Sequence, residues 1–319
     1  MANAQHIPTV AVILPCFNEA SSIGDVVTAF RAALPAADIY VYDNASTDGT
    51  ARVARAAGAI VRHEPQKGKG NAVRRAFADV DADIYVMADG DDTYDAADAP
   101  AMIELLRQNT FDMIVGVRET GAADAYRPGH VFGNRAFSAM FRWLFRSVFT
   151  DILSGYRVFS RRFVKSFPSA SAGFEIELEI STHAALLRLP VAEMATQYRA
   201  RPEGGVSKLN TMTDGYRILR RMFSFLRLHR PRFVYSLAAA AGALLSVAFA
   251  APVIVEYLET GLVPRFPTLI VAASMMLAAF VVFAVGIILD SQARYFAETK
   301  RLAYVSMAPP APIAESDPA

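Results

Sequence analysis

Three closely spaced carboxylates follow a short apolar run of the sequence. Asp89, Asp91 and Asp92 come directly after the run from Ile84 to Ala88. Carboxylates this close together repel one another unless a cation binds them. An Asp-x-Asp pair offers the hard oxygen ligands that Mg²⁺ and Mn²⁺ prefer, and these metals take their other ligands from water and phosphate. Asp89 and Asp91 are therefore predicted to bind Mg²⁺ or Mn²⁺ together with a diphosphate substrate.

A second pattern points to the same kind of substrate. A predicted helix opens with Lys67-Gly68-Lys69-Gly70, where backbone N–H groups and an ammonium group can meet an anion. The pattern is not a Walker A loop, because no Gly-Lys-Ser/Thr follows at the required spacing. No Gly-x-Gly-x-x-Gly follows the first predicted strand, which argues against a nicotinamide or flavin site.

Two more polar clusters follow predicted strands. One is Pro15-Cys16-Phe17-Asn18-Glu19, which leads into a helix, and the other runs from Asp43 to Thr50. Turns and helix N-caps also use Asp, Asn, Ser and Gly. Turn chemistry alone is therefore an alternative explanation for Ser46, Thr47 and Thr50.

Strand-length apolar runs alternate with helical patterns in the first part of the chain. The predicted strands are Val10 to Leu14, Ile39 to Tyr42, Ile60 to Val61, Ile84 to Ala88 and Met113 to Val117. The predicted helices are Ile23 to Ala33, Thr50 to Ala57, Gly70 to Ala78 and Ala99 to Gln108. This alternation predicts an α/β fold with a mostly parallel, Rossmann-like sheet and helices on both faces. Ligands bind at the carboxyl ends of the strands in such sheets, and the polar clusters follow three of these strands.

The composition excludes several classes of protein. The 319 residues are 53% apolar and 20% charged, which is too apolar for a disordered chain. The formal net charge of +1 gives no support to nucleic-acid binding. Cys16 is the single cysteine, which excludes an internal disulfide and a multi-cysteine zinc site.

The apolar excess is concentrated near the C-terminus. Phe233 to Val255 and Phe266 to Leu289 contain no charged residue. At about 1.5 Å per residue each run reaches roughly 35 Å, enough for a hydrocarbon core of about 30 Å. The two runs are therefore predicted to form a transmembrane hairpin. A pair of buried helices in a soluble protein is the weaker alternative, because both runs are apolar on all sides.

Basic residues flank the two spans on one side of the hairpin. They are Arg227, Arg230 and Arg232 before the first span and Arg294, Lys300 and Arg301 after the second. Because the connection offers only Arg265, the positive-inside rule predicts that residues 1–232 are cytoplasmic. No basic-then-apolar start precedes Ile7, so no secretory signal contradicts this orientation.

Four parts of the chain are predicted in all. Residues 1–210 form a catalytic domain, and residues 233–289 form the hairpin. Residues 211–232 include Asp214 to Arg230, where arginines alternate with apolar residues as in an amphipathic helix on the anionic inner leaflet. An ordinary surface helix is the alternative for that segment. Residues 290–319 form a cytoplasmic tail whose Pro- and Ala-rich end is disordered.

Four motifs, in order, resemble those of the inverting family 2 glycosyltransferases of the GT-A fold. They are ILPCFNEASSI, VYDNASTDGT, QKGKGNAV and MADGDDTYD. Thr150 to Arg157 resembles that family's Asp-x-x-Ser-Gly-aromatic-Arg segment, and Gly205 to Leu209 resembles its Ser-Lys-Leu segment. The resemblance extends over Pro8 to Arg230. It is closest to the polyprenyl-phosphate glycosyltransferases, which include dolichyl-phosphate mannose synthase and bacterial relatives with two C-terminal spans.

The resemblance implies a role for each matching residue. Pro15, Asn18 and Glu19 would line the nucleoside site, and Asp43 would accept hydrogen bonds from the base edge. Lys69 would approach the diphosphate, and Asp89 and Asp91 would hold the metal. Asp151 would lie beside the anomeric carbon, and Lys208 would neutralise phosphate. The fourth predicted strand ends in Asp-Gly-Asp-Asp-Thr-Tyr, unlike the eukaryotic Asp-Ala-Asp-Leu-Gln, which leaves a metal role for Asp92 open.

The implied reaction displaces UDP or GDP from C1 of a sugar with inversion. A polyprenyl phosphate acceptor is largely dianionic at neutral pH, because its second pKa is about 6, and it needs charge compensation more than a base. Asp151 would then orient the acceptor or stabilise the sugar. A lipid or small-molecule hydroxyl is the alternative acceptor, and it would require a true general base.

A phosphate acceptor also predicts a cationic cradle that faces the membrane. The candidates are Arg118, Arg127, Arg135 and Arg201, together with Lys208. A solvated surface charge is the alternative for each arginine. Glu175 or Glu177 is a candidate for contact with the sugar, and His183 is predicted to be a packed helix residue.

Two other classes of protein are alternatives to this interpretation. A processive polysaccharide synthase needs a Gln-x-x-Arg-Trp motif, which is missing around Trp143. A membrane-tethered nucleotide-sugar binder without turnover would not need the intact acidic and basic residues. The predicted partners are a nucleotide diphosphate sugar, polyprenyl phosphate and membrane lipids, and the spans permit a homodimer or tetramer. The predicted location is the bacterial inner membrane, with the catalytic domain in the cytoplasm.

Overall fold

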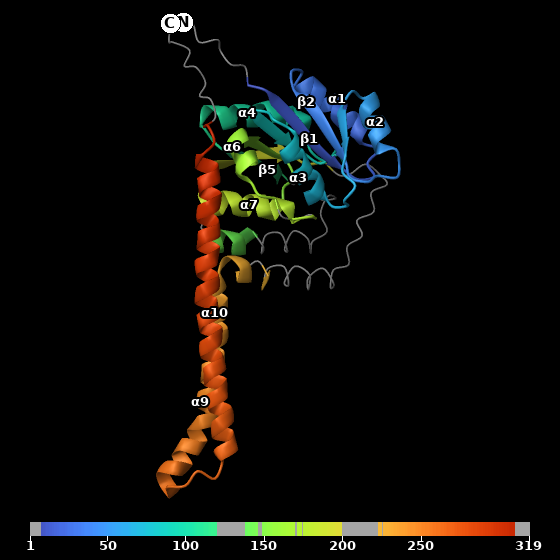
Figure 1. Cartoon of the computed structure of the whole chain (residues 1–319). Helices are drawn as coiled ribbons and strands as arrows, with labels where there is room; N and C mark the ends of the chain where they lie inside the picture. Colours follow the sequence, from blue (N-terminus) through green and yellow to red (C-terminus); the bar gives the residue numbers. More distant parts are fainter. Residues whose placement is uncertain are drawn as a thin grey trace, which may run out of the picture. The chain divides into compact units, whose positions relative to one another are not determined.

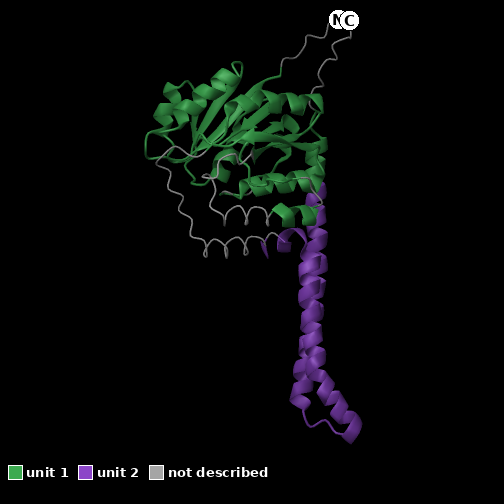
Figure 2. Cartoon of the chain, turned by 180° about the vertical axis from the view of Figure 1, so that it is seen from behind, with its two compact units in different colours: residues 1–208, 300–319 green, residues 209–299 purple. Residues whose placement is uncertain are grey.

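The computed structural model (Figure 1) describes residues 8–119, 138–145, 149–169, 171–173, 175–199, 223–224 and 226–309. Four predicted phosphate-binding residues lie outside these ranges: Arg127, Arg135, Arg201 and Lys208. Most of the predicted juxtamembrane segment 211–232 and the end of the tail also lie outside them. The chain divides into two units, residues 1–208 with 300–319, and residues 209–299 (Figure 2).

A seven-stranded sheet forms the centre of the first unit (Figure 1). Its strands are β1 (Val10–Cys16), β2 (Asp38–Asp43), β3 (Ile60–His63), β4 (Ile84–Met87), β5 (Met113–Glu119), β6 (Arg157–Ser160) and β7 (Val191–Gln197). They are ordered β3-β2-β1-β4-β6-β5-β7. β6 is antiparallel to β4 and β5, whereas the other neighbouring strands are parallel. The predicted α/β fold with a mostly parallel sheet is confirmed, and all five predicted strands are present.

Helices form where the apolar spacing predicts them. They are α1 (Ile23–Ala33), α2 (Thr50–Ala56), α3 (Lys69–Asp79), the 3-10 turn η1 (Ala96–Asp98), α4 (Ala99–Gln108), α6 (Arg161–Ser166) and α7 (Ile176–Leu187). In α1 the buried residues recur every three or four positions, at Ile23, Val26, Val27 and Phe30. The four predicted helices are confirmed, with ends that differ by at most one residue.

Helices pack on both faces of the sheet. Val12 and Leu14 of β1 share one core cluster with Val27 of α1 and Met102 of α4. On the other face Phe77 of α3 meets Tyr85 of β4, because successive side chains of a strand point to opposite faces. The sheet is therefore covered on both sides, and its functional groups are left to the loops at the strand ends.

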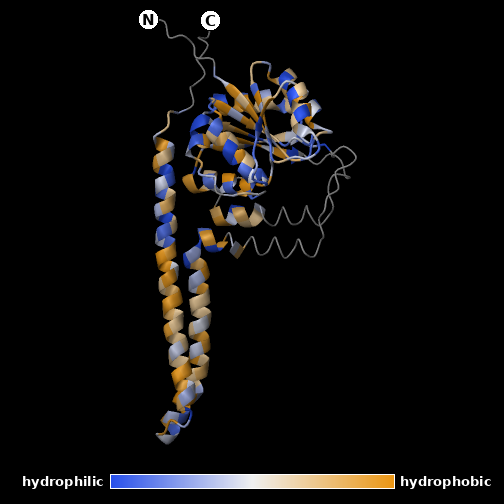
Figure 3. Ribbon diagram, turned by 45° about the vertical axis from the view of Figure 1, so that its right-hand side comes forward, coloured by the Kyte–Doolittle hydropathy of each residue, from blue (hydrophilic) through white to orange (hydrophobic). Residues whose placement is uncertain are grey.

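The second unit consists mainly of two long helices. α9 (Pro231–Thr260) and α10 (Phe266–Val305) are long and apolar enough to cross a membrane, and they contain the two predicted spans. Within the unit Ser246 Oγ donates to Ala272 O at 2.7 Å. A Cβ on Gly286 would lie 2.6 Å from Tyr235 Cβ, so glycine permits the close approach of the helices. Many large apolar side chains of both helices are exposed. The hydropathy colours of Figure 3 show hydrophobic residues along much of both helices.

The last turns of α10 belong to the first unit, where they contact a buried carboxylate. Asp112, directly before β5, is fully buried. Its oxygens accept hydrogen bonds from Arg162 Nε at 2.6 Å, Arg162 Nη2 at 2.7 Å and Tyr304 Oη at 2.6 Å. Ser160 Oγ adds a fourth hydrogen bond at 2.7 Å. Asp112 thus joins β5, β6, α6 and the end of α10.

Replacement of Asp112 by alanine is expected to lower the free energy of unfolding by about 3 kcal/mol or more, because it leaves the largely buried Arg162 without its carboxylate. Thermal unfolding of the detergent-solubilised protein measures this effect. Tyr304→Phe removes one hydrogen bond and is expected to cost about 1 kcal/mol. Equal effects of the two substitutions would contradict a central role of Asp112.

Candidate functional site

The loops after β1 and β2 are joined by side chains at the carboxyl edge of the sheet. Asn18 N donates to Ser46 Oγ at 2.9 Å, and Asn18 Oδ1 accepts from Thr47 N at 2.8 Å. Glu19 N donates to Thr50 Oγ1 at 2.9 Å. Ser46, Thr47 and Thr50 therefore act in loop structure, which agrees with the turn-chemistry alternative. Their hydrogen bonds fix the backbone of Asn18 and Glu19.

Asp43 offers a buried acceptor at the end of β2. Its Oδ2 lies 3.4 Å from His63 Nδ1, whereas its Oδ1 is buried without a hydrogen-bond partner in the described part of the chain. Neighbouring Asn44 holds the loop after β3 by accepting from Gly68 N at 2.6 Å. A ligand N–H group can satisfy this oxygen of Asp43, and its contact with the base edge of a nucleotide stays a prediction.

An ion cluster lies beside this loop and involves Lys69 at the start of α3. Lys69 Nζ contacts Asp89 Oδ1, and it lies 2.5 Å from Glu177 Oε1 of α7. Burial would lower the pKa of Lys69, but the charges of Asp89 and Glu177 raise it overall. The ammonium group therefore keeps its charge. A Cβ on Gly155 would lie 2.7 Å from Asp89 Oδ2, so glycine in the Ser-Gly-Tyr-Arg segment makes room for the cluster.

Glu19 is held near the same carboxylates. Its Oε2 is buried and has no hydrogen-bond partner among the described residues. Burial, together with the charges of Asp89 and Asp91, raises the pKa of Glu19 to about 8. Gly90, between the two aspartates, lies so close to Glu19 Oε2 that a Cβ there would clash. Glu19, Asp89 and Asp91 therefore form one acidic group at the ends of β1 and β4.

The raised pKa of Glu19 predicts a pH-dependent stability. Between the ordinary glutamate pKa of 4.5 and the raised value of about 8, the folded chain keeps a proton that the unfolded chain loses, so this residue makes stability fall as pH rises. Glu19→Gln removes the effect. In EDTA the variant is expected to be more thermostable than the parent by an amount that grows from pH 5 to pH 8. A difference in thermostability between the variant and the parent that does not change with pH would contradict this expectation.

The chemistry of this acidic group fits a divalent cation that is shared with a phosphate ligand. Asp89 and Asp91 supply oxygen donors, and Thr93 Oγ1 donates to Asp91 Oδ1 at 2.6 Å, which orients that carboxylate. Within the described ranges, no group of three or more His, Cys, Asp or Glu side chains is arranged to hold a metal by itself. The two aspartates suit Mg²⁺ or Mn²⁺ because these ions take remaining ligands from water and phosphate.

Asp151 forms a second ion pair, with Arg118 near the end of β5. Arg118 Nε lies 2.7 Å from Asp151 Oδ2, and Arg118 Nη2 lies 2.8 Å from Oδ1. Glu193 of β7 supports this loop by accepting from Thr150 N at 2.6 Å. Both ion-pair partners are largely buried. Asp151 is thus a carboxylate held in one orientation by a bidentate cation.

Aromatic residues and one buried arginine connect the two ion clusters. The Arg118 guanidinium lies 5.5 Å from the ring of Tyr198, which packs on Tyr94. Tyr94 Oη accepts from Gly155 N at 3.0 Å, beside the Lys69 cluster.

Arg157 Nε donates to Ser154 O at 2.8 Å, and Arg157 Nη2 donates to Ile152 O at the same distance. Burial lowers the pKa of Arg157 to about 10, so it stays charged at neutral pH while it shapes the 151–155 loop.

The structure brings Glu19, Lys69, Asp89 and Asp91 together and pairs Arg118 with Asp151. Pro15 lies within β1, directly before the Asn18–Glu19 loop. Of the glutamates predicted for sugar contact, Glu177 touches Lys69. Sequence reasoning missed the supporting residues Tyr94, Arg157 and Glu193, although Tyr94 and Arg157 lie within the quoted motifs.

His183 is packed as predicted. It is buried and lies edge-on to Phe163 and Phe167, with ring centroids 5.3 Å away in each case. Burial lowers its pKa to about 3, so it is neutral at physiological pH. Its surroundings are those of a core residue.

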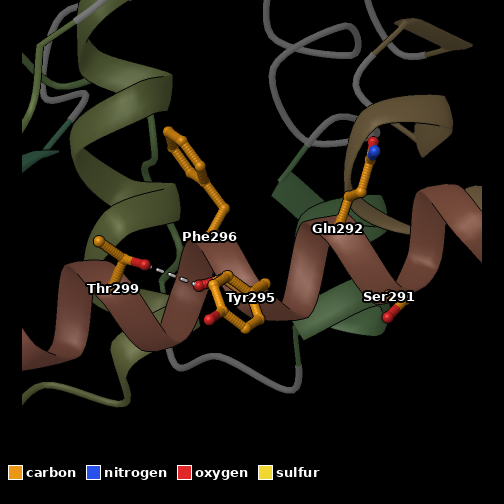
Figure 4. A pocket seen from close by; sticks show the side chains of 5 residues that line it. All are labelled: Ser291, Gln292, Tyr295, Phe296 and Thr299. Carbon is orange, nitrogen blue, oxygen red and sulfur yellow. Dashed lines mark hydrogen bonds between the residues drawn. The ribbon is translucent and has the colours of Figure 1, made fainter.

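A separate hollow of about 450 Å³ lies on α10. Its lining residues are Ser291, Gln292, Tyr295, Phe296 and Thr299 (Figure 4). Within the helix Thr299 Oγ1 donates to Tyr295 O at 3.0 Å. None of the candidate site residues that the structure describes lines this hollow.

Known proteins are similar to this chain in sequence. The family model described as Glycosyl transferase family 2 matches residues 11–167. Glycosyltransferase AglJ of Haloferax volcanii is 35% identical over 232 residues, which cover 71% of this chain and 75% of AglJ. The dolichyl-phosphate hexose transferase of the same organism is 29% identical over 207 residues, 64% of this chain and 88% of that protein. The family match includes Asp89 and Asp151 and ends before Glu177.

The fold is also similar to that of a solved structure. This is glucosyl-3-phosphoglycerate synthase from Mycobacterium tuberculosis in complex with Mn²⁺, UDP-glucose and phosphoglyceric acid. The TM-score is 0.55 at 25% sequence identity, with 67% of this chain and 80% of that chain covered. The similarity supports the α/β fold of the first unit.

Proposed function

The chain belongs to glycosyl transferase family 2 and is a glycosyltransferase with a nucleotide-sugar donor, and we propose that it transfers the sugar, with inversion at C1, to a polyprenyl phosphate. The name of the similar dolichyl-phosphate hexose transferase supports an acceptor of this class. The donor is a UDP- or GDP-sugar. The product is a polyprenyl-phosphate sugar.

The proposed acceptor class is based mainly on the ion pair between Arg118 and Asp151. A hydroxyl acceptor needs a base that can take its proton in the transition state. Both oxygens of Asp151 contact the Arg118 guanidinium, which stabilises the ionised carboxylate and makes it a weak base. A phosphate dianion needs no such base, and it can itself bind the guanidinium. The pair therefore favours a phosphate acceptor over the hydroxyl alternative.

On the donor side, Asp43 would contact the base edge of the nucleotide and Lys69 would contact the diphosphate. Asp89 and Asp91 would hold Mg²⁺ or Mn²⁺, which when bound stabilises the negative charge of the departing diphosphate. The Mn²⁺ and UDP-glucose in the solved structure of similar fold support this assignment. Arg127, Arg135, Arg201 and Lys208 remain proposed ligands of the acceptor phosphate.

We place the reaction at the cytoplasmic face of a bacterial inner membrane. A polyprenyl phosphate keeps its phosphate at the interface and its tail in the bilayer, so its transferase must work at the membrane. The exposed apolar side chains of α9 and α10 and the basic residues that flank both spans support this location and orientation.

The lipid product provides the test of this function. Membranes that contain the protein are incubated with radiolabelled UDP- or GDP-sugars and then extracted with organic solvent. The expected result is an extractable product whose label is released by mild acid, since a glycosyl phosphate is acid-labile. Label that enters only water-soluble or polymeric material would contradict the proposal.

A further inference from the structure

The ion cluster at Lys69 holds one more carboxylate than its proposed donor-binding role requires. Lys69 Nζ lies between Asp89 Oδ1 and Glu177 Oε1, so one ammonium group serves two carboxylates. The side chains of Lys69 and Glu177 are only 10% and 5% exposed, so solvent screens their charges weakly. Glu177 therefore has a strong electrostatic effect on Lys69 and, through it, on Asp89.

The local backbone is built to deliver Glu177 to this position. A Cβ on Gly68 or Gly70 would clash with backbone oxygens of residues 171–172, so the start of α3 packs directly on the segment before α7. Gly70 N donates to Gly173 O at 3.2 Å, and Asn71 N donates to Ala172 O at 3.3 Å. The glycines on both sides of Lys69 thus bring the first turns of α3 and α7 together.

The charges of the cluster favour a cation. Asp89, Asp91 and Glu177 bring three negative charges against the two positive charges of Lys69 and the buried Arg157, whose guanidinium also interacts with Glu177. If Lys69 paired with Asp89 alone, it would neutralise that carboxylate and repel a metal ion. Because Glu177 shares the ammonium group, the site as a whole stays negative.

We propose that Glu177 is a positioning residue that acts through Lys69 and keeps the charge of Asp89 available to a divalent cation. This inference rests on the proposed function, since it assumes that Asp89 and Asp91 bind the metal. Glu177 itself is not a metal ligand. It sets the affinity of the site for the ion and fixes Lys69 where the diphosphate of the donor binds.

The direct readout is Mn²⁺ affinity of the purified full-length protein, measured by electron paramagnetic resonance of free Mn²⁺ without any sugar donor. Glu177→Gln is expected to weaken Mn²⁺ binding about tenfold, the order of magnitude of one unit charge at short range. Glu177→Asp retains the negative charge and is expected to keep most of the Mn²⁺ affinity of the parent protein. Glu104→Gln makes the same change of charge at an exposed residue of α4 that accepts a hydrogen bond from Gln108, and it is expected to leave affinity unchanged.

Lys69→Gln gives a second test with the opposite sign. It removes the positive charge from the cluster, so it is expected to tighten Mn²⁺ binding while it lowers sugar transfer. Thermal unfolding in EDTA identifies a variant that fails to fold. Parent-like Mn²⁺ affinity in folded Glu177→Gln protein, or weaker binding in Lys69→Gln, would overturn the role of Glu177. If Asp91→Asn leaves Mn²⁺ binding intact, the metal assignment itself is wrong, and this inference is wrong with it.

Discussion

Asp91→Asn is expected to lower metal-dependent sugar transfer by a factor of about 10²–10³, which is the usual loss when one electrostatic contact to the developing charge is removed. The amide is similar in shape to the carboxylate but carries no charge. Asp91 lies in the acidic group with Glu19 and Asp89, and Thr93 holds its orientation. The substitution therefore removes a proposed metal ligand with little change in packing.

Initial rates with varied Mg²⁺ or Mn²⁺ measure the effect of Asp91→Asn. Asp38→Asn is the matched control, because Asp38 is an exposed carboxylate at the opposite end of β2. The control is expected to keep the parent rate. A variant at Asp91 whose transfer is still fully stimulated by Mg²⁺ would refute the metal assignment.

Arg118→Ala is expected to lower kcat/KM for the lipid acceptor about a hundredfold, while the KM for the nucleotide sugar changes little. The substitution removes the proposed phosphate ligand and leaves Asp151 without its bidentate partner. Arg118→Lys restores the charge but cannot form two parallel hydrogen bonds, so an intermediate kcat/KM is expected.

Steady-state kinetics with each substrate varied in turn separate these effects of Arg118. Arg75→Ala is the control, because Arg75 is exposed and pairs with Asp79 on the surface of α3. A loss confined to the KM of the nucleotide sugar would place Arg118 on the donor side and contradict its assignment to the acceptor.

Much of the fold could be predicted because its signals are local. The apolar spacing of α1 and the buried runs of β1 and β4 identify these elements without any knowledge of their neighbours. β6 was missed because its sequence begins with the buried Arg157 and ends with Ser160, so only two apolar residues signal the strand. β7 was missed because polar and small residues interrupt its sequence at the edge of the sheet.

The residues of the candidate site were likewise predictable only where a short local motif contains them. Asp89, Asp91 and Lys69 lie in short motifs whose residue types already indicate a metal and a diphosphate. The support given by Glu193 to Thr150 and the contact of Glu177 with Lys69 join residues far apart in the chain. No local pattern encodes such contacts, because they depend on how the strands are ordered in the sheet.

The proposed acceptor is an ionised lipid phosphate and not a hydroxyl. The most direct measurement is a competition assay. The purified protein is incubated with equal amounts of a polyprenyl phosphate and the corresponding polyprenol, together with the nucleotide sugar that yields the lipid product in membranes. We expect transfer to the phosphate, with inverted configuration at C1 of the sugar, and none to the alcohol. Comparable transfer to the polyprenol would contradict the proposed acceptor.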